Sequence, residues 1–271
     1  MKDQAVEIAN RETTDQARRN RLREYLHHVL LRQLFERDLL DQLVFHGGTA
    51  LRIVHDLPRF SEDLDFHLVR PDPAYDLGVA LDGMRRDLEN SGYRVRLKPR
   101  LRGTVQSCMV VFERLLYECG LSSRENQKLN VRLEVDTNPP PRFHFEKKLV
   151  NVYLPFVVLH HDKPSFLAGK LHAVLKRKFA KGRDFFDLFF YLSRWRDVSP
   201  NLPYLNHALR QTGYPGPRVT ETNWRELAAS RVKALSWNQV ERDVEPFLLR
   251  PEDRKALDKS LLLKMLESAD R

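Results

Sequence analysis

Two aspartates one residue apart are the strongest chemical feature of the sequence. Asp63 and Asp65 alternate with Leu64 and Phe66, so on a β-strand both carboxylates leave the same face, about 7 Å apart. Two ionised groups placed in this way repel each other unless a cation compensates, and their oxygens suit Mg²⁺. The pair predicts a metal site; a solvent-facing acidic strand at a sheet edge is the alternative.

A glycine turn that precedes this strand is suited to holding phosphate. The apolar run 43–45 leads into Gly47, Gly48 and Thr49, and a helix-forming segment follows. Backbone N–H groups and the positive end of a helix attract anions, and Thr49 stands near the helix cap. Such turns are common in proteins. Only the neighbouring aspartates turn this one into a prediction of triphosphate binding, and His46 beside it fits a structural role better than that of a base.

The order of turn, helix and Asp-x-Asp strand resembles the nucleotidyltransferase superfamily. Within it, the stretch GGTALRIVHDLPRFSEDLDF, residues 47–66, is similar to the AbiEii/AbiGii-type nucleotidyltransferases, the toxin halves of type IV toxin–antitoxin and phage-abortive systems. The resemblance covers roughly residues 42–192. It implies a metal-bound NTP as substrate, an RNA acceptor, particularly a tRNA 3′ end, and a cognate antitoxin.

A second block of the chain, at 170–188, resembles the downstream K-L-x-A…R…RD-x-x-D motif of that family. Lys170 and Arg177 are seven residues apart and so share one stripe of a helix. By resemblance Lys170 engages the triphosphate, while Asp184 and Asp187 join the site without the sequence saying which of them points inward. A solvated basic helix is the alternative for the cations, and the helix dipole favours carboxylates at a helix start in any case.

A third carboxylate is expected on the apolar-alternating strand 128–136. Glu134 occupies the place of the acidic residue in the family's hydrophobic-E-hydrophobic strand, where a third carboxylate completes a two-metal site with Asp63 and Asp65 and orients or deprotonates the attacking hydroxyl. Asp136 lies two residues along the same face, so the choice between them stays open. A polar outer face balanced by Arg132 is the alternative for both.

Two residues between the helix and the Asp-x-Asp strand also belong to the candidate site. Ser61 shares the face of Asp63 if the strand begins early, and otherwise stabilises a turn. Arg59 pairs with a phosphate or with Asp65, and the sequence does not decide between these partners.

The formal net charge of the 271-residue chain is +9, which favours polyanionic partners. A strand-like alternation puts Arg94, Arg96 and Lys98 on one face, and we predict that they bind nucleic acid. A second basic cluster lies at 18–23, on a segment with helical apolar spacing. Ordinary solvated faces are the alternative for both.

Cysteine content and hydropathy bear on the compartment. Two cysteines are too few for a tetrahedral zinc site and do not suggest a secreted disulfide framework. No run of about 18 apolar residues occurs. These features predict a cytoplasmic protein with no membrane partner.

The expected fold is α/β (α+β): a mixed-sheet nucleotidyltransferase core with an N-terminal helix over 1–160, and a helical domain over 161–271 that contributes to the active-site cleft. The predicted strands are 43–45, 63–67, 93–98, 105–112 and 128–137, and the predicted helices are 15–38, 49–55, 75–90, 166–178, 183–193, 204–210, 223–234, 238–248 and 252–268.

The predicted function is a Mg²⁺-dependent nucleotidyltransferase toxin that holds two ions, moves NMP from NTP to an RNA acceptor, by resemblance a tRNA 3′ end, and releases pyrophosphate. Nucleotidylation of a protein side chain or a small molecule is one alternative. A catalytically inactive nucleic-acid-binding module is another.

Overall fold

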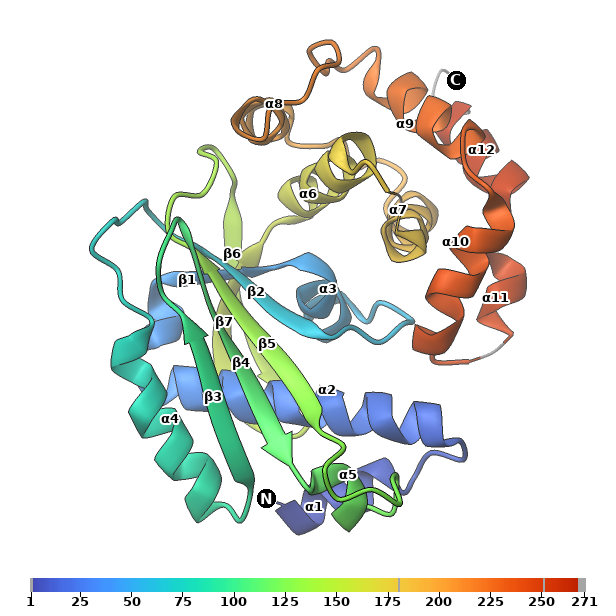
Figure 1. Cartoon of the computed structure of the whole chain (residues 1–271). Coiled ribbons are helices and arrows are strands. Elements are labelled where there is room, and N and C mark those ends of the chain that lie inside the picture. The colour runs from blue at the N-terminus through green and yellow to red at the C-terminus, as the bar shows by residue number, and fades with distance from the viewer. Residues whose placement is uncertain (1, 180, 251, 268–271) are drawn as a thin grey trace. The chain divides into compact units, whose positions relative to one another are not determined.

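The fold combines one mixed β-sheet with helices, as the α/β prediction requires, in a computed structural model that describes residues 2–179, 181–250 and 252–267. The strands of the described chain are β1 Leu43–His46, β2 Asp63–Leu68, β3 Arg94–Arg100, β4 Val105–Glu113, β5 Leu129–Asp136, β6 Phe145–Asn151 and β7 Pro155–His161. They lie in the order β3-β4-β5-β2-β1-β7-β6 (Figure 1). Strand β2 is antiparallel to β1 and parallel to β5, which makes the sheet mixed.

In the sequence, the described helices precede the strands, alternate with them, and follow the last strand without interruption by a further strand. They are α1 Lys2–Ala9, α2 Asp15–Phe35, α3 Gly47–His55, α4 Gly78–Asn90, α5 Leu115–Glu118, α6 Lys163–Lys176, α7 Gly182–Arg194, α8 Leu202–Gln211, α9 Trp224–Lys233, α10 Trp237–Val244, α11 Asp253–Ala256 and α12 Lys259–Glu267, with short 3-10 turns at Leu39–Asp41 and Glu245–Phe247.

The chain divides into two compact units. The sheet unit comprises Met1–Asp56, Phe60–Pro139 and Lys147–His160; the helical unit comprises Leu57–Arg59, Pro140–Glu146 and His161–Arg271. The short segment 57–59 thus belongs to the helical unit, although both of its flanking segments belong to the sheet unit.

In the sheet unit, helix α2 holds the glycine turn in place. It contacts β5 and α4, and its Glu24 Oε1 accepts a 2.6 Å hydrogen bond from Arg52 Nε on α3. Glu24 is buried, and its pKa is lowered: burial works to raise it, but Arg52 and Arg21 outweigh that effect. The ion pair therefore fixes the helix that begins at Gly47.

The basic cluster at 18–23 is not an open binding face. Arg18 donates to the carbonyl oxygen of Cys119 at 3.0 Å, Arg21 pairs with Glu12 and Glu24 at 2.6 Å, and Arg23 lies 3.7 Å from Glu62. Arg19 donates to the carbonyl of Leu121. These guanidinium groups tie α2 to neighbouring loops, so the expectation of a second basic ridge is wrong.

Several elements were not predicted from the sequence. Strand β6 is almost fully exposed and lacks apolar alternation, and β7 starts at a proline, which is typical of a strand end. The expected helix 252–268 is instead α11 and α12, because the Asp258 carboxylate accepts the Leu261 N–H and starts a new helix. Its predicted end, Ser268, lies outside the described residues.

Both cysteines are buried with free thiols, and burial raises the pKa of Cys108 and Cys119 to about 11. Within the described residues, no helix combines the length and apolar character needed to span a membrane.

Two buried histidines on α2 make folding sensitive to acid. Burial lowers the pKa of His27 to about 3 and that of His28 to about 4. The Nε2 atom of His27 lies 3.0 Å from the carbonyl oxygen of Glu62, just before β2. Both rings therefore stay neutral in the folded chain at pH values where they protonate in the unfolded chain.

We expect the free energy of unfolding to fall as the pH drops below about 6.5, where the unfolded histidines begin to bind protons that the folded chain excludes. At pH 5 the loss is about 2 kcal/mol for each histidine. Urea unfolding at pH 7.5, 6 and 5 measures it. His27→Leu should flatten the pH dependence, whereas His144→Gln, at a side chain that is 74% exposed, should leave it unchanged. An equal slope in all three proteins would contradict this account.

Candidate active site

The register of β2 places its two aspartates at the centre of one sheet face. Asp63 lies opposite Arg132 of β5, and Asp65 lies opposite Glu134 of β5 and His46 of β1. Leu64 and Phe66, which alternate with them, are buried. The carboxylates of Asp63 and Asp65 therefore share one face, as the alternation predicts.

The glycine turn meets this face at Asp65. Gly47 has a φ of +77°, and a Cβ atom added to it would lie only 2.6 Å from Asp65 Oδ2. Both the left-handed backbone and the closeness of the carboxylate require glycine at this position. Helix α3 starts here with His46 as N-cap residue and with no hydrogen bond from its side chain to the helix. The first turn therefore presents backbone N–H groups beside Asp65.

The structure changes the expected parts of Thr49 and Ser61. Thr49 is buried inside the first turn of α3, and its hydroxyl donates to the backbone carbonyl of Asp63. It links the helix to β2 instead of capping the helix. Because β2 begins at Asp63, the condition under which Ser61 would share the face of the aspartates is not met.

Register also separates the two candidates for the third carboxylate. Glu134 lies opposite Asp65, whereas Asp136 lies opposite His67, two residues further along β2. The carboxylate of Asp136 accepts the N–H of Asn138, and burial raises its pKa. Glu134 is the better placed of the two. Its Oε1 lies 3.2 Å from Arg132 Nη1, so Arg132 also balances the charge of this carboxylate, as the alternative interpretation expects.

The predicted basic strand lies on the same face as the aspartates. One row of register partners runs from Lys98 on β3 through Met109 and Arg132 to Asp63, and the next row runs from Arg100 to Asp65. Each step between strands is about 4.8 Å, so Lys98 lies about 14 Å from Asp63 across the sheet. Arg96 pairs with Glu113 at 2.5 Å, while Arg94, Lys98 and Arg100 are exposed. A cationic strip thus borders the acidic pair.

The donor set suits a hard cation held jointly with a nucleotide. In the part of the chain that the structure describes, no group of three or more His, Cys, Asp or Glu side chains is arranged to hold a metal ion. Asp63 and Asp65 supply oxygen donors, and cations such as Mg²⁺ are commonly held by one or two carboxylates together with substrate phosphates. The protein residues fit an ion that arrives with its nucleotide better than a closed protein cage.

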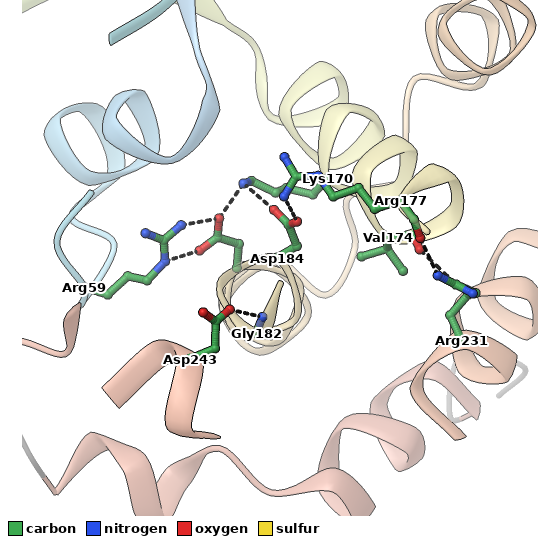
Figure 2. A network of polar contacts seen from close by, with 9 residues as sticks. Arg59, Lys170, Val174, Arg177, Gly182, Asp184, Arg231 and Asp243 are labelled. Atoms are coloured by element: carbon green, nitrogen blue, oxygen red, sulfur yellow. Dashed lines mark hydrogen bonds and ion pairs between the residues drawn. The ribbon is translucent and has the colours of Figure 1, made fainter. Parts of the chain in front are cut away.

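A separate polar network fills the core of the helical unit (Figure 2). Asp187 on α7 accepts two hydrogen bonds from Arg59, from Nε at 2.7 Å and from Nη2 at 2.6 Å. Lys170 Nζ on α6 lies 2.6 Å from Asp187 Oδ2 and 3.4 Å from Asp184 Oδ1. Arg177 pairs with the other oxygen of Asp184. Arg59 thus pairs with a carboxylate that lies 128 residues further along the chain.

Burial decides what these residues can do. Asp187 is completely buried, and its pKa is lowered: burial works to raise it, but Arg59 and Lys170 outweigh that effect. Both carboxylate oxygens of Asp187 already contact cationic side chains. Asp187 therefore acts as a residue that positions Lys170. Asp184 is also buried, so both aspartates of the RD-x-x-D motif point inward.

The backbone around this network is equally fixed. Arg231 on α9 donates to the carbonyl oxygens of Val174 and Arg177 at the end of α6, at 3.1 and 2.7 Å. At the start of α7, the Gly182 N–H donates to Asp243 Oδ2 at 2.5 Å (Figure 2). A Cβ on Gly182 would lie 2.2 Å from the carbonyl oxygen of Val240, so glycine is needed for α7 to approach α10.

The comparison with known families decides what this chain is. Residues 28–261 match the family described as nucleotidyl transferase AbiEii toxin, type IV TA system. The chain belongs to the AbiEii family. It is a nucleotidyltransferase, and this membership implies an NTP substrate, a divalent metal and a cognate antitoxin. The resemblance seen in the sequence motifs is confirmed.

Two of the solved structures that match the chain come from Helicobacter pylori. One, described as a "putative nucleotidyltransferase", is 20% identical, with a TM-score of 0.48, and the match covers 91% of this chain and 97% of that one. JHP933 is also 20% identical, with a TM-score of 0.45 and coverage of 90% and 94%. No curated protein matches the chain significantly.

Replacing Gly47 tests its contact with Asp65. Gly47→Ala should lower nucleotidyl transfer about 100-fold, because a methyl group there must displace the carboxylate by about an ångström. Gly120→Ala is the matched control: Gly120 also has a positive φ, +65°, but its added Cβ would meet no atom within 4 Å. The control should lose stability through backbone strain and keep its activity. Equal activity losses in the two variants would overturn the role of the contact.

The buried network is tested by comparing it with an exposed ion pair. Asp187→Asn should destabilise the fold by about 3–5 kcal/mol, since it leaves two buried cations without their carboxylate. Arg96→Gln breaks the exposed pair with Glu113 and should cost less than about 1 kcal/mol. Urea unfolding of the three proteins measures both losses, and similar values for the two variants would contradict the assignment.

Proposed function

We propose that this AbiEii-family enzyme transfers an NMP group from an NTP to an RNA hydroxyl and releases pyrophosphate, with a tRNA 3′ end as the acceptor. The acceptor oxygen forms a bond to the α-phosphorus, and the bond from the α-phosphorus to the bridging oxygen of pyrophosphate breaks. One observation carries the proposal: Asp65 lies directly against the Gly47 turn on the face that Asp63 and Glu134 share. An RNA substrate of this kind places the enzyme in the cytoplasm.

The sheet unit supplies the groups that would hold the reacting phosphates. Asp63 and Asp65 would bind Mg²⁺, with two ions as the proposed number, and the backbone N–H groups of Gly47, Gly48 and Thr49 would bind phosphate oxygens. When bound, the metal neutralises the charge that develops on the phosphates. Glu134 would accept a hydrogen bond from the attacking hydroxyl and orient it.

The helical unit would supply the cation for the outer phosphates. Lys170 carries this role by resemblance, and its buried pairing with Asp187 holds its side chain in one place. Arg177, paired with Asp184, is the second cation proposed for the nucleotide. Only three residues of the chain separate Arg59, which holds Asp187, from Asp63.

The charge on the sheet face supports RNA over a small molecule as acceptor. Arg94, Arg96 and Lys98, with Arg100, form a cationic strip in register with the aspartates. The phosphates of an RNA strand can pair with the cations of this strip, and RNA binding should weaken as the salt concentration increases. An aminoglycoside acceptor, being cationic itself, would be repelled by it.

Transfer of label from α-³²P-labelled NTPs to total tRNA tests the proposal. With Mg²⁺, the wild-type enzyme should label RNA with at least one of the four NTPs. Asp63→Asn and Asp65→Asn should each lower the rate about 1000-fold or more, because each removes charge that stabilises the transition state. Asp82→Asn, which alters an acid that is 86% exposed on α4, is the matched control and should retain full activity.

Other outcomes separate the alternatives. Label found on the protein and lost in Ser61→Ala would assign self-nucleotidylation in place of RNA modification. If neither RNA nor protein carries label with any of the four NTPs, the proposed activity is overturned.

A further inference from the structure

A second cationic site lies in the helical unit, away from the buried network. It is a cavity of about 730 Å³ between α8 and the segment 218–222, with Arg142 at its edge. Ligand-binding clefts have volumes of this order. Leu202, Pro203 and Val219 give it an apolar floor, and Arg210 and Arg218 complete its cationic rim.

The guanidinium groups of this rim have no hydrogen-bond or ion-pair partner among the residues that the structure describes. Within the described residues, the side chains of Arg142, Arg210 and Arg218 make no hydrogen bond or ion pair, in contrast to the paired arginines of α2 and of the buried network. The rim holds one acid, the exposed Glu221, so positive charge is in excess there. Cations that line one cavity are stabilised when an anion binds among them.

The walls of the cavity are fixed before any ligand arrives. Asn206 clamps the segment 218–222 to α8: its Nδ2 donates to the Val219 carbonyl at 2.8 Å, and its Oδ1 accepts the Val219 N–H at 2.9 Å. Arg142 has a φ of +72°, a strained value for a residue with a side chain. The buried Asn201 holds it there by donating to its carbonyl at 2.7 Å.

The combination of an apolar floor with an arginine rim matches the two halves of a nucleotide. A base packs against apolar side chains or a guanidinium plane, and Arg binds phosphate through paired N–H groups. A bare anion would not use the floor. Arg210 and Arg218 also line an adjoining cavity of about 200 Å³ next to Tyr214, so the site is longer than one nucleotide, which favours a chain over a free mononucleotide.

We propose that this arginine-rimmed cavity of α8 is an RNA-binding subsite, which takes a single-stranded segment of the acceptor with its bases on the apolar floor and its phosphates on Arg142, Arg210 and Arg218. The proposal rests on the RNA acceptor proposed above. It adds a binding surface to that function and assigns no step of the reaction to these arginines.

Fluorescence anisotropy with a labelled single-stranded RNA of about 12 nucleotides tests the subsite. All binding variants carry Asp65→Asn, so that binding is read without turnover. Arg210→Gln with Arg218→Gln should weaken RNA binding about tenfold or more and lower the slope of log K against log salt by about 1.4, the value for two lost phosphate contacts. The control, Arg85→Gln with Arg86→Gln at two exposed positions of α4, removes the same charge and should change affinity less than about twofold.

Further measurements distinguish RNA from a free nucleotide and from a protein as the ligand of the cavity. Unlabelled mononucleotides should compete poorly; competition as strong as that of RNA would assign a free nucleotide instead. If an acidic peptide binds the cavity, and the cavity and control variants bind RNA equally well, the cavity is assigned to a protein partner and the proposal is overturned. Equal RNA binding by itself also overturns it. If the wild type fails to label RNA yet the cavity variant loses RNA binding, the proposed activity fails and the subsite stands.

Discussion

The close approach of the Asp65 carboxylate to the backbone of Gly47 is the constraint on which the candidate site depends. It exists because β2 lies between β1 and β5, which sets His46 and Glu134 on either side of Asp65. A residue with a side chain at position 47 would fill the space that the carboxylate occupies. The turn, the acidic strand and the third carboxylate thus depend on one register, and a slip of β2 by one residue would turn its two aspartates to the buried face.

Positive charge is used in two different ways in this protein. The arginines of α2 and the group around Asp187 are paired inside the fold, where burial makes an uncompensated charge costly. The strip on β3 and the rim of the α8 cavity hold exposed cations, most of them without carboxylate partners. The net charge of the chain does not distinguish these two groups, because a guanidinium that is paired inside the fold adds the same charge as one that is exposed and has no carboxylate partner.

Local patterns predicted much of the fold. Strand β5 buries Leu129, Val131, Leu133 and Val135 on one face, so its alternation was readable, and the start of α2 at Asp15 agreed with prediction. Strand β7 was missed although it lies beside β1, because a short run that contains two histidines carries no clear period. Motif spacing also identified the family, since the glycine turn and Asp-x-Asp strand are local in sequence.

The sequence by itself determined the local chemistry: which carboxylates share a face, where the chain must turn at glycine, and that the chain is a nucleotidyltransferase of the AbiEii type. Only the tertiary structure decided the partners. Arg59 binds Asp187 across 128 residues, Thr49 bonds the backbone of Asp63, and Arg142 joins α8 at a cavity. Side chain alternation is a property of adjacent residues, whereas pairing across such separations depends on how the packed elements meet.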